Sequence, residues 1–280
     1  MKKITRRSFL AAAGLTAAAL ALTACGGSSS STASSVASSA ATSSEAASSS
    51  AAAAELTTVE VGKLTMATNA AFPPYEMTTD AGDFEGIDIE TAQAIADKLG
   101  LELQIDDMDF DAALLSVQQG KADIVMAGVT VTDERKAVMD FSDSYATGIQ
   151  SIIVPEGSDI ASPDDLAGKK IGTQRGTTGY IYCSDDFGDE NVVAYDDGLT
   201  AVQALNNGQV DAVVIDNAPA KEFIAANPGL VILETSYAEE DYAIGLAKGS
   251  SLEDAINSAL EELKADGTLQ SIVDKYISAE

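Results

Sequence analysis

Gly128, Thr130 and Arg135 lie close together in the sequence and could bind a carboxylate together. A short apolar segment, 124–127, precedes Gly128, and Arg135 falls at the start of a helical pattern. A glycine lets a ligand approach the backbone closely. Thr130 adds a hydroxyl and an N–H group, and a guanidinium is a planar fork of donors that matches a carboxylate. The spacing predicts a receptor for the α-carboxylate of an amino acid. The alternative is an ordinary strand, loop and helix in which Arg135 pairs with solvated acids.

Asp216 is the second charged candidate, because it ends the apolar segment 211–216. An aspartate at the end of a buried strand is costly to desolvate unless it meets a cation. The alternative role is the N-cap of a helix that begins near Ala218. The two roles are compatible, because a carboxylate has two oxygens.

Five segments resemble the polar amino-acid-binding proteins of solute-binding family 3, which feed ABC importers and include glutamine and lysine/arginine/ornithine binders. The segments are 67–76 (Ala-Thr-Asn-Ala-Ala-Phe-Pro-Pro-Tyr-Glu), 86–90 (Gly-Ile-Asp-Ile-Glu), 123–135, 173–179 (Thr-Gln-Arg-Gly-Thr-Thr-Gly) and 211–216. The resemblance covers nearly all of residues 60–278. It implies an α/β, two-lobed periplasmic-binding-protein-like fold (type II, Venus-flytrap) with two crossover hinge strands.

The resemblance also implies roles for single residues. Phe72 and Phe110 would lay aromatic rings on the two faces of the ligand, although either ring alone could be ordinary core packing. Thr177 and Thr178, at a helix start whose N–H groups favour anions, would complete the carboxylate site when the lobes close. Asp216 would bind the α-ammonium group, so that the ligand bridges it to the arginine of the other lobe.

Three residues bear on which amino acid is bound. Asn69 stands where glutamine and lysine/arginine/ornithine binders commonly have an acid, and Gln174 where the glutamine binder has a lysine. Both are neutral and able to donate or accept hydrogen bonds, so they favour a polar, uncharged ligand such as glutamine or cystine. A basic amino acid is the alternative. Glu76 would restore negative charge if it pointed inward, but we expect its side chain to be exposed.

The elements that must position these residues alternate between short apolar runs and helical patterns, as in an α/β fold. Predicted strands are 63–67, 101–105, 123–127, 151–154, 170–173, 192–195, 210–215, 231–233 and 242–247. Predicted helices are 87–99 (closed by Gly100), 111–119, 163–166, 177–183, 199–206, 219–226, 252–264 and 269–277. Residues 57–145 and 242–280 would form lobe 1 and residues 146–241 lobe 2. The chain would cross between the lobes near Tyr145–Ile149 and Ala238–Asp241.

Composition excludes several classes of protein. The chain has 44 Asp and Glu against 16 Lys and Arg, which argues against nucleic-acid binding, because phosphate contacts need clustered cations. It has no histidine, which excludes histidine-based triads and imidazole metal sites. We expect no metal, no cofactor and a monomer. Once Cys25 is lipidated, Cys183 has no partner for a disulfide, and we expect it to be buried.

The N-terminus predicts export and a lipid anchor. Residues 1–24 have a basic start and an apolar run too short to span a membrane comfortably, as in a signal peptide. Leu22-Thr-Ala-Cys25 resembles a bacterial lipobox, in which the cysteine thiol receives acyl chains. Residues 25–56, mostly Ser, Ala and Thr, read as a disordered tether. Arg6-Arg7 leaves twin-arginine and general export open. A Gram-positive cell face is expected, or else a Gram-negative envelope.

The prediction is a lipid-anchored receptor that binds a free amino acid between two closing lobes and delivers it to an ABC permease and ATPase complex in the same membrane. The main alternative is an enzyme, since cyclohexadienyl dehydratases resemble this fold. They need a poised general acid, for which only Asp216 or Glu76 could serve. A third possibility is a sensor that reports occupancy to a partner. No signalling segment follows Glu280 in the sequence, which counts against a built-in sensor.

Overall fold

The computed structural model describes residues 56–277. The predicted signal peptide, the predicted lipidation site Cys25 and all but the last residue of the predicted tether lie outside the described residues. Within residues 56–277, no helix has the length and apolar character needed to cross a membrane. Strands and helices alternate along this part of the chain, which confirms the predicted α/β class.

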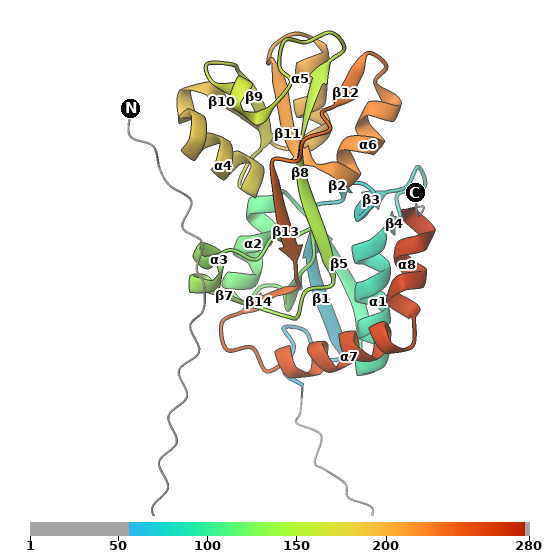
Figure 1. Ribbon diagram of the computed structural model, residues 1–280. Coiled ribbons are helices and arrows are strands. Elements are labelled where there is room, and N and C mark those ends of the chain that lie inside the picture. The colour runs from blue at the N-terminus through green and yellow to red at the C-terminus, as the bar shows by residue number, and fades with distance from the viewer. Residues whose placement is uncertain (1–55, 278–280) are drawn as a thin grey trace, which may run out of the picture. The chain divides into compact units, whose positions relative to one another are not determined.

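The first sheet has five strands in the order β5-β1-β6-β14-β7 (Figure 1). β1 pairs in parallel with β5 and β6, whereas β14 is antiparallel to β6 and β7. Because parallel neighbours need a crossover, a helix follows each of β1 and β5. The strands are β1 (Lys63–Thr68), β5 (Glu102–Asp107), β6 (Ile124–Val125), β7 (Met139–Phe141) and β14 (Gly245–Ala247). The helices beside this sheet are α1 (Ile87–Leu99), α2 (Phe110–Gln118), α3 (Asp133–Val138), α7 (Glu253–Ala265) and α8 (Thr268–Tyr276).

The second sheet has six strands in the order β10-β9-β11-β8-β12, and β13 pairs with β8 outside that path. Every residue of β11 is buried, because the three helices α4, α5 and α6 pack on this strand. The strands are β8 (Ala146–Pro155), β9 (Ile171–Gln174), β10 (Val192–Tyr195), β11 (Ala212–Asp216), β12 (Leu230–Ile232) and β13 (Ala238–Tyr242). The helices are α4 (Thr178–Phe187), α5 (Gly198–Asn206) and α6 (Asn217–Ala226).

Two antiparallel strands of the second sheet, β8 and β13, run side by side from that sheet toward the first one (Figure 1). Gln150 lies opposite Ala238, and Ala146 lies opposite Tyr242. The sequence placed strands at 151–154 and 242–247. Instead, β8 is one long strand from Ala146, and the second segment is divided, because β13 ends at Tyr242 and β14 begins at Gly245. The lobe boundaries drawn from the sequence stay a prediction.

A small three-stranded sheet, which the sequence did not predict, follows β1. It consists of β2 (Ala71–Phe72), β3 (Glu76–Thr78) and β4 (Phe84–Glu85) in that order. It ends at Gly86, whose φ is 132° and whose added Cβ would overlap the backbone carbonyl of Tyr75. A glycine is therefore needed for the chain to turn from β4 into α1. The small sheet places Glu76 in the protein interior.

The helix boundaries agree with the sequence within a few residues. The predicted helix 87–99 is α1, and Gly100 closes it in the left-handed conformation as expected. The largest difference is in α4, which runs to Phe187 rather than ending at Cys183. The segment 163–166 is a 3-10 helix, η1 (Pro163–Leu166), and a second one, η2 (Asp189–Asn191), precedes β10. Cys183 is a buried free thiol, as predicted, and burial raises its pKa to about 12.

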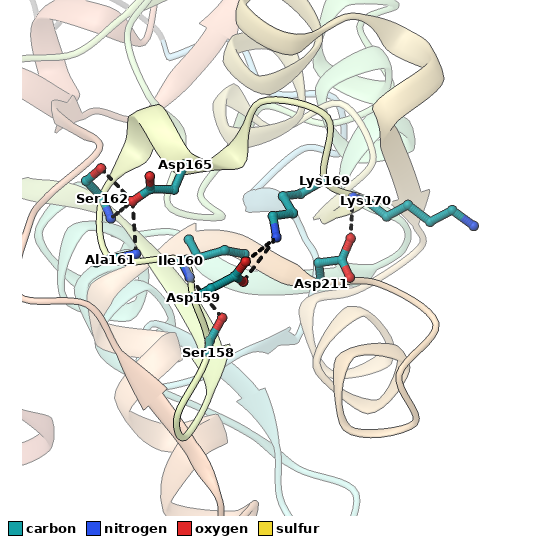
Figure 2. Close-up of polar contacts among 9 residues, drawn as sticks. All are labelled: Ser158, Asp159, Ile160, Ala161, Ser162, Asp165, Lys169, Lys170 and Asp211. Atoms are coloured by element: carbon teal, nitrogen blue, oxygen red, sulfur yellow. Dashed lines mark hydrogen bonds and ion pairs between the residues drawn. The ribbon is translucent and has the colours of Figure 1, made fainter.

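The loop between β8 and β9 is held by its own polar side chains (Figure 2). Ser162 and Asp165 form a capping box at the start of η1. Lys169 Nζ pairs with Asp159 Oδ2 at 2.9 Å in an exposed ion pair. These contacts shape a surface loop, and none of the predicted ligand-binding residues takes part in them.

Candidate ligand-binding site

All ten residues that the sequence nominated line one cavity, which also includes Glu76 and Ala127. The atom-free space of the cavity is about 310 Å³, which includes open solvent. The ten residues are Asn69, Phe72, Phe110, Gly128, Thr130, Arg135, Gln174, Thr177, Thr178 and Asp216. The structure therefore brings them together, and their contacts with a ligand stay a prediction.

Arg135 is placed by the first turn of α3, where the side chain of Thr132 accepts a hydrogen bond from the Arg135 N–H at 3.2 Å. Its side chain is buried, with 8% exposure. The guanidinium donates to the carbonyls of Thr130 (2.7 Å) and Gly176 (3.1 Å). A guanidinium has five donors, so three are left for a carboxylate. Burial lowers the pKa of Arg135, and the charge of Glu240 opposes that effect.

Phe110 supports the arginine as well as lining the cavity. Its ring centroid lies 5.4 Å from Cζ of Arg135, within the range of a cation–π contact. The ring at the other predicted position, Phe72, stacks on Tyr75 with centroids 5.9 Å apart. Both rings are thus held by protein contacts in addition to facing the cavity.

Gly128 occupies a turn that favours glycine. Its φ is 55°, and an added Cβ would lie 2.9 Å from Cε1 of Phe72. The Gly128 N–H donates to Asp88 Oδ2 at 3.0 Å, and the same oxygen accepts from the hydroxyl of Tyr145 at 2.8 Å. Burial raises the pKa of Asp88 to about 6, although these two hydrogen bonds oppose the rise. Asp88, which the sequence did not single out, thus fixes the turn that is predicted to bind the carboxylate.

Asp216 ends β11 beside the cavity and is buried. It accepts hydrogen bonds from Gln150 Nε2 at 2.7 Å and from the hydroxyl of Tyr242. Its side chain makes no N-cap hydrogen bond to α6, so the capping alternative is not what holds it. Burial is the main cause that raises the pKa of Asp216 to about 7; the Tyr242 hydrogen bond opposes the rise, and the charge of Glu240 adds to it.

Asn69 and Gln174 bind each other across the cavity. Gln174 Nε2 donates to Asn69 Oδ1 at 2.8 Å and also lies 3.4 Å from the carbonyl of Asp196. Asn69 Nδ2 donates to the carbonyl of Met108 at 3.0 Å. Three of the four amide N–H bonds therefore go to the protein, and what the pair has left is mainly the acceptor capacity of its oxygens.

Thr177 and Thr178 lie at the start of α4, as the sequence predicted. Thr177 is the N-cap, since its side chain accepts from the Tyr180 N–H at 3.3 Å, and its hydroxyl donates to the carbonyl of Gln174 at 2.8 Å. The hydroxyl of Thr178 donates to Glu240 Oε2 at 2.9 Å. The N–H groups of the first helical turn have no carbonyl partner within the helix, which suits an anion.

Three further residues belong to the site but were missed or misplaced. Glu240 and Gln150, from the crossing strands, are buried behind Thr130, Thr178 and Asp216. Glu76 was expected to be exposed, yet its exposure is 0% because the small sheet turns it inward. Desolvation and the nearby Asp88 raise the pKa of Glu76 well above its usual range. Successive side chains of a strand point to opposite faces, and only this alternation could have indicated that one of the three acids at 239–241 points inward.

Comparison with known proteins identifies a family and a set of relatives. Residues 64–279 match the model of the bacterial extracellular solute-binding proteins, family 3. The L-cystine-binding protein TcyJ of Escherichia coli K12 is 33% identical over 226 residues, covering 79% of this chain and 85% of TcyJ. The arginine-binding extracellular protein ArtP of Bacillus subtilis is 32% identical over 228 residues, covering 78% and 87% of the two chains.

Among solved structures, an ancestral arginine-binding protein bound to arginine matches with a TM-score of 0.74 and 42% identity, over 78% of this chain and 99% of that one. An ancestral arginine-binding protein bound to glutamine matches with the same TM-score, identity and coverage. The two-lobed periplasmic-binding-protein fold implied by the sequence resemblance is thereby confirmed.

Proposed function

The chain belongs to the bacterial extracellular solute-binding proteins of family 3, as an amino-acid-binding component of an ABC transporter, and we propose that its ligand is a basic amino acid such as arginine. This family consists of binding proteins, which confirms the prediction that the chain is not an enzyme. The same finding speaks against the alternative of a dehydratase. In place of the uncharged ligand favoured by the sequence we propose its alternative, a basic amino acid, since several of the similar proteins are named for arginine or histidine.

The excess of buried acids around the cavity carries the proposal. Arg135 is the only cationic side chain that lines the cavity within the described residues, whereas Asp216 and Glu76 line it and Glu240 lies directly behind. A zwitterion would place its carboxylate on Arg135 and its ammonium on Asp216. A second acid, Glu76, also lines the cavity, with both oxygens buried next to the carboxyl of Asp88. Buried carboxyls favour a cation, so a positively charged ligand side chain fits this balance better than a neutral one.

The amide pair supports the same ligand class. Asn69 and Gln174 use most of their N–H groups on each other and on backbone carbonyls. What they leave for a ligand is acceptor oxygens, and a guanidinium is a donor-only group. The two neutral residues that suggested an uncharged ligand therefore accommodate a cation.

Binding would close the two lobes, which we take as residues 57–145 with 242–280 and residues 146–241. Arg135 and Asp216 belong to different lobes under this division, so one amino acid reaches both only when the lobes meet. Its contacts in the closed arrangement then favour that arrangement over an open one. Hydrogen bonds across the boundary, from Arg135 to Gly176 and from Gln174 to Asn69, add to its stability.

The anchor completes the proposal. Lipidation of Cys25 would hold the protein on the outer face of the cell membrane, beside its permease and ATPase, with residues 25–56 as a tether. A Cys25→Ala variant should then leave the membrane fraction and lose the mass of the acyl chains. Retention of the variant in the membrane would contradict the anchor.

Isothermal titration of the purified protein with arginine, lysine, histidine, glutamine and cystine tests the ligand class. We expect arginine to bind in the micromolar to tens-of-nanomolar range, about −8 to −11 kcal/mol. A preference for glutamine or cystine over every basic amino acid would contradict the proposal. The neighbouring exposed arginine provides a matched control, because Arg175→Ala should bind normally whereas Arg135→Ala should not.

A further inference from the structure

Glu240 is a buried acid of the crossing strand β13 to which neither the sequence motifs nor the proposed ligand contacts give a role. Its exposure is 7%, whereas its neighbours on the strand, Glu239 and Asp241, are exposed. One oxygen, Oε2, accepts three hydrogen bonds. The donors are Thr130 Oγ1 at 3.1 Å, Thr178 Oγ1 at 2.9 Å and Gln150 Nε2 at 3.0 Å.

The direction of these hydrogen bonds follows from the groups involved. An ionised carboxylate can only accept, and a threonine hydroxyl has a single proton to give. Thr130 and Thr178 therefore each spend their proton on Glu240. Their own oxygens lie 3.4 Å apart, a long contact that fits two hydroxyls whose protons both point elsewhere.

Thr130 and Thr178 both line the ligand cavity, whereas Glu240 does not. With their protons directed to Glu240, they present only lone pairs to the cavity. Lone pairs suit an N–H donor and repel a carboxylate oxygen. The ligand's carboxylate is left to the free donors of Arg135 and the N–H groups at the start of α4.

The same network reaches the predicted ammonium site. Gln150 Nε2 donates to Glu240 and also to Asp216 Oδ2 at 2.7 Å. Both amide protons of Gln150 are thus used, and the two acids are held at fixed positions on either side of it. An ammonium group beside Asp216 would have the lone pairs of Thr130 and Thr178 within the same cavity.

We propose that Glu240 is a positioning residue that orients the hydroxyls of Thr130 and Thr178 as acceptors for the ligand's α-ammonium group. Thr130 lies in the loop between β6 and α3, and Thr178 begins α4. Glu240 therefore also joins the two sides of the cavity through a single oxygen. This inference rests on the proposed function, because it concerns how the same site recognises a free amino acid.

The test compares arginine with 5-guanidinopentanoate, which lacks only the α-ammonium group, by isothermal titration of the whole protein. The measured quantity is the ratio of the two Kd values. Glu240→Ala frees both hydroxyl protons, and we expect it to lower the preference for arginine by at least about fivefold, the scale of one hydrogen bond. Glu240→Gln keeps an acceptor oxygen for the hydroxyls and should hold the ratio within about twofold of wild type. Glu239→Ala, on the exposed face of the same strand, is the matched control and should change neither Kd.

A role in structure alone would weaken both ligands equally and leave the ratio unchanged, which would overturn the proposal. If Glu240→Ala does not fold, Thr178→Val decides, because it removes one of the two acceptors and must lower the same ratio. A Thr178→Val protein with the wild-type ratio would refute the acceptor role of the hydroxyl. If the wild-type protein binds glutamine rather than arginine, the proposed ligand class fails. The Glu240 test is then run with glutamine and glutaramate and keeps its meaning.

Discussion

Lowering the pH from 7 to 5 should weaken arginine binding, because the ligand's ammonium group needs an ionised Asp216. The pKa of Asp216 is raised to about 7, chiefly by burial. About half of the molecules then carry the charge at pH 7, and only about 1% carry it at pH 5. If only the ionised form binds, Kd should rise about fiftyfold between these two pH values. Arginine itself does not change charge in this interval.

The stability of the protein without arginine should change in the opposite direction. The folded pKa of Asp216 lies above its ordinary value of 3.8, so the folded state holds the proton more tightly than the unfolded state does. The resulting stabilisation is fully present below pH 3.8 and is lost as the pH rises to about 7. Weak binding at pH 5 would therefore not be a sign of unfolding. Thermal melts in the titration buffers check this.

Isothermal titration with arginine at pH 5, 6, 7 and 8 measures the effect. Other acids near Asp216 also titrate, namely Asp88, with a pKa raised to about 6, and Glu76. An Asp216→Asn variant separates them: it should bind weakly at every pH and lose most of the pH dependence. A wild-type Kd that is flat from pH 5 to 8 would refute the assignment of Asp216 to the ammonium group. So would an Asp216→Asn variant with the full wild-type dependence.

Three further predictions follow from the same site. Arg135→Ala should remove the thermal shift given by every amino acid, since losing one partner of a buried charge pair costs about 2–5 kcal/mol, and a normal shift with any ligand would contradict the carboxylate role. Gly128→Ala should lower the melting temperature more than Gly62→Ala. Both glycines have positive φ (55° and 82°), but only at Gly128 would the added Cβ lie 2.9 Å from Phe72. Equal losses would show that packing around the turn is unimportant. Asn69→Asp should raise the preference for arginine over glutamine in competition titrations by about tenfold, the scale of one charge-assisted hydrogen bond. An unchanged preference would show that the ligand's side chain does not lie beside residue 69.

Much of the fold could be read from local patterns. The strand β1, the helix α1 and its Gly100 C-cap depend on residues that are neighbours in sequence, and these came out nearly as predicted. The gathering of Arg135 and Asp216 around one cavity was also predictable. That prediction rested on the resemblance to the amino-acid-binding family, because local patterns place each residue at or after an apolar strand but do not show that the two come together.

The positions that the sequence could not give depend on distant pairings. Which acid of 239–241 turns inward is decided by the register of β13 on β8, where Glu240 lies opposite Gly148. The burial of Glu76 depends on the small sheet, whose short strands have no clear pattern of their own. The pairing of Asn69 with Gln174 joins residues 105 positions apart, and neither residue type reveals which of its groups remains free.

That last pairing explains how two neutral amides can favour a charged ligand. A glutamine side chain in the cavity would bring a carbonyl that needs a donor, but both N–H groups of Gln174 already point to Asn69 and to the Asp196 carbonyl, which leaves only the second N–H of the Asn69 amide to meet it. An unsatisfied buried carbonyl costs about 1–3 kcal/mol, which is roughly a fivefold to hundredfold loss of affinity. A guanidinium brings no acceptor and avoids that cost. Part of the selectivity would therefore reside in the backbone carbonyls of Met108 and Asp196, which use up the amide donors and which no side-chain substitution at those two positions would remove.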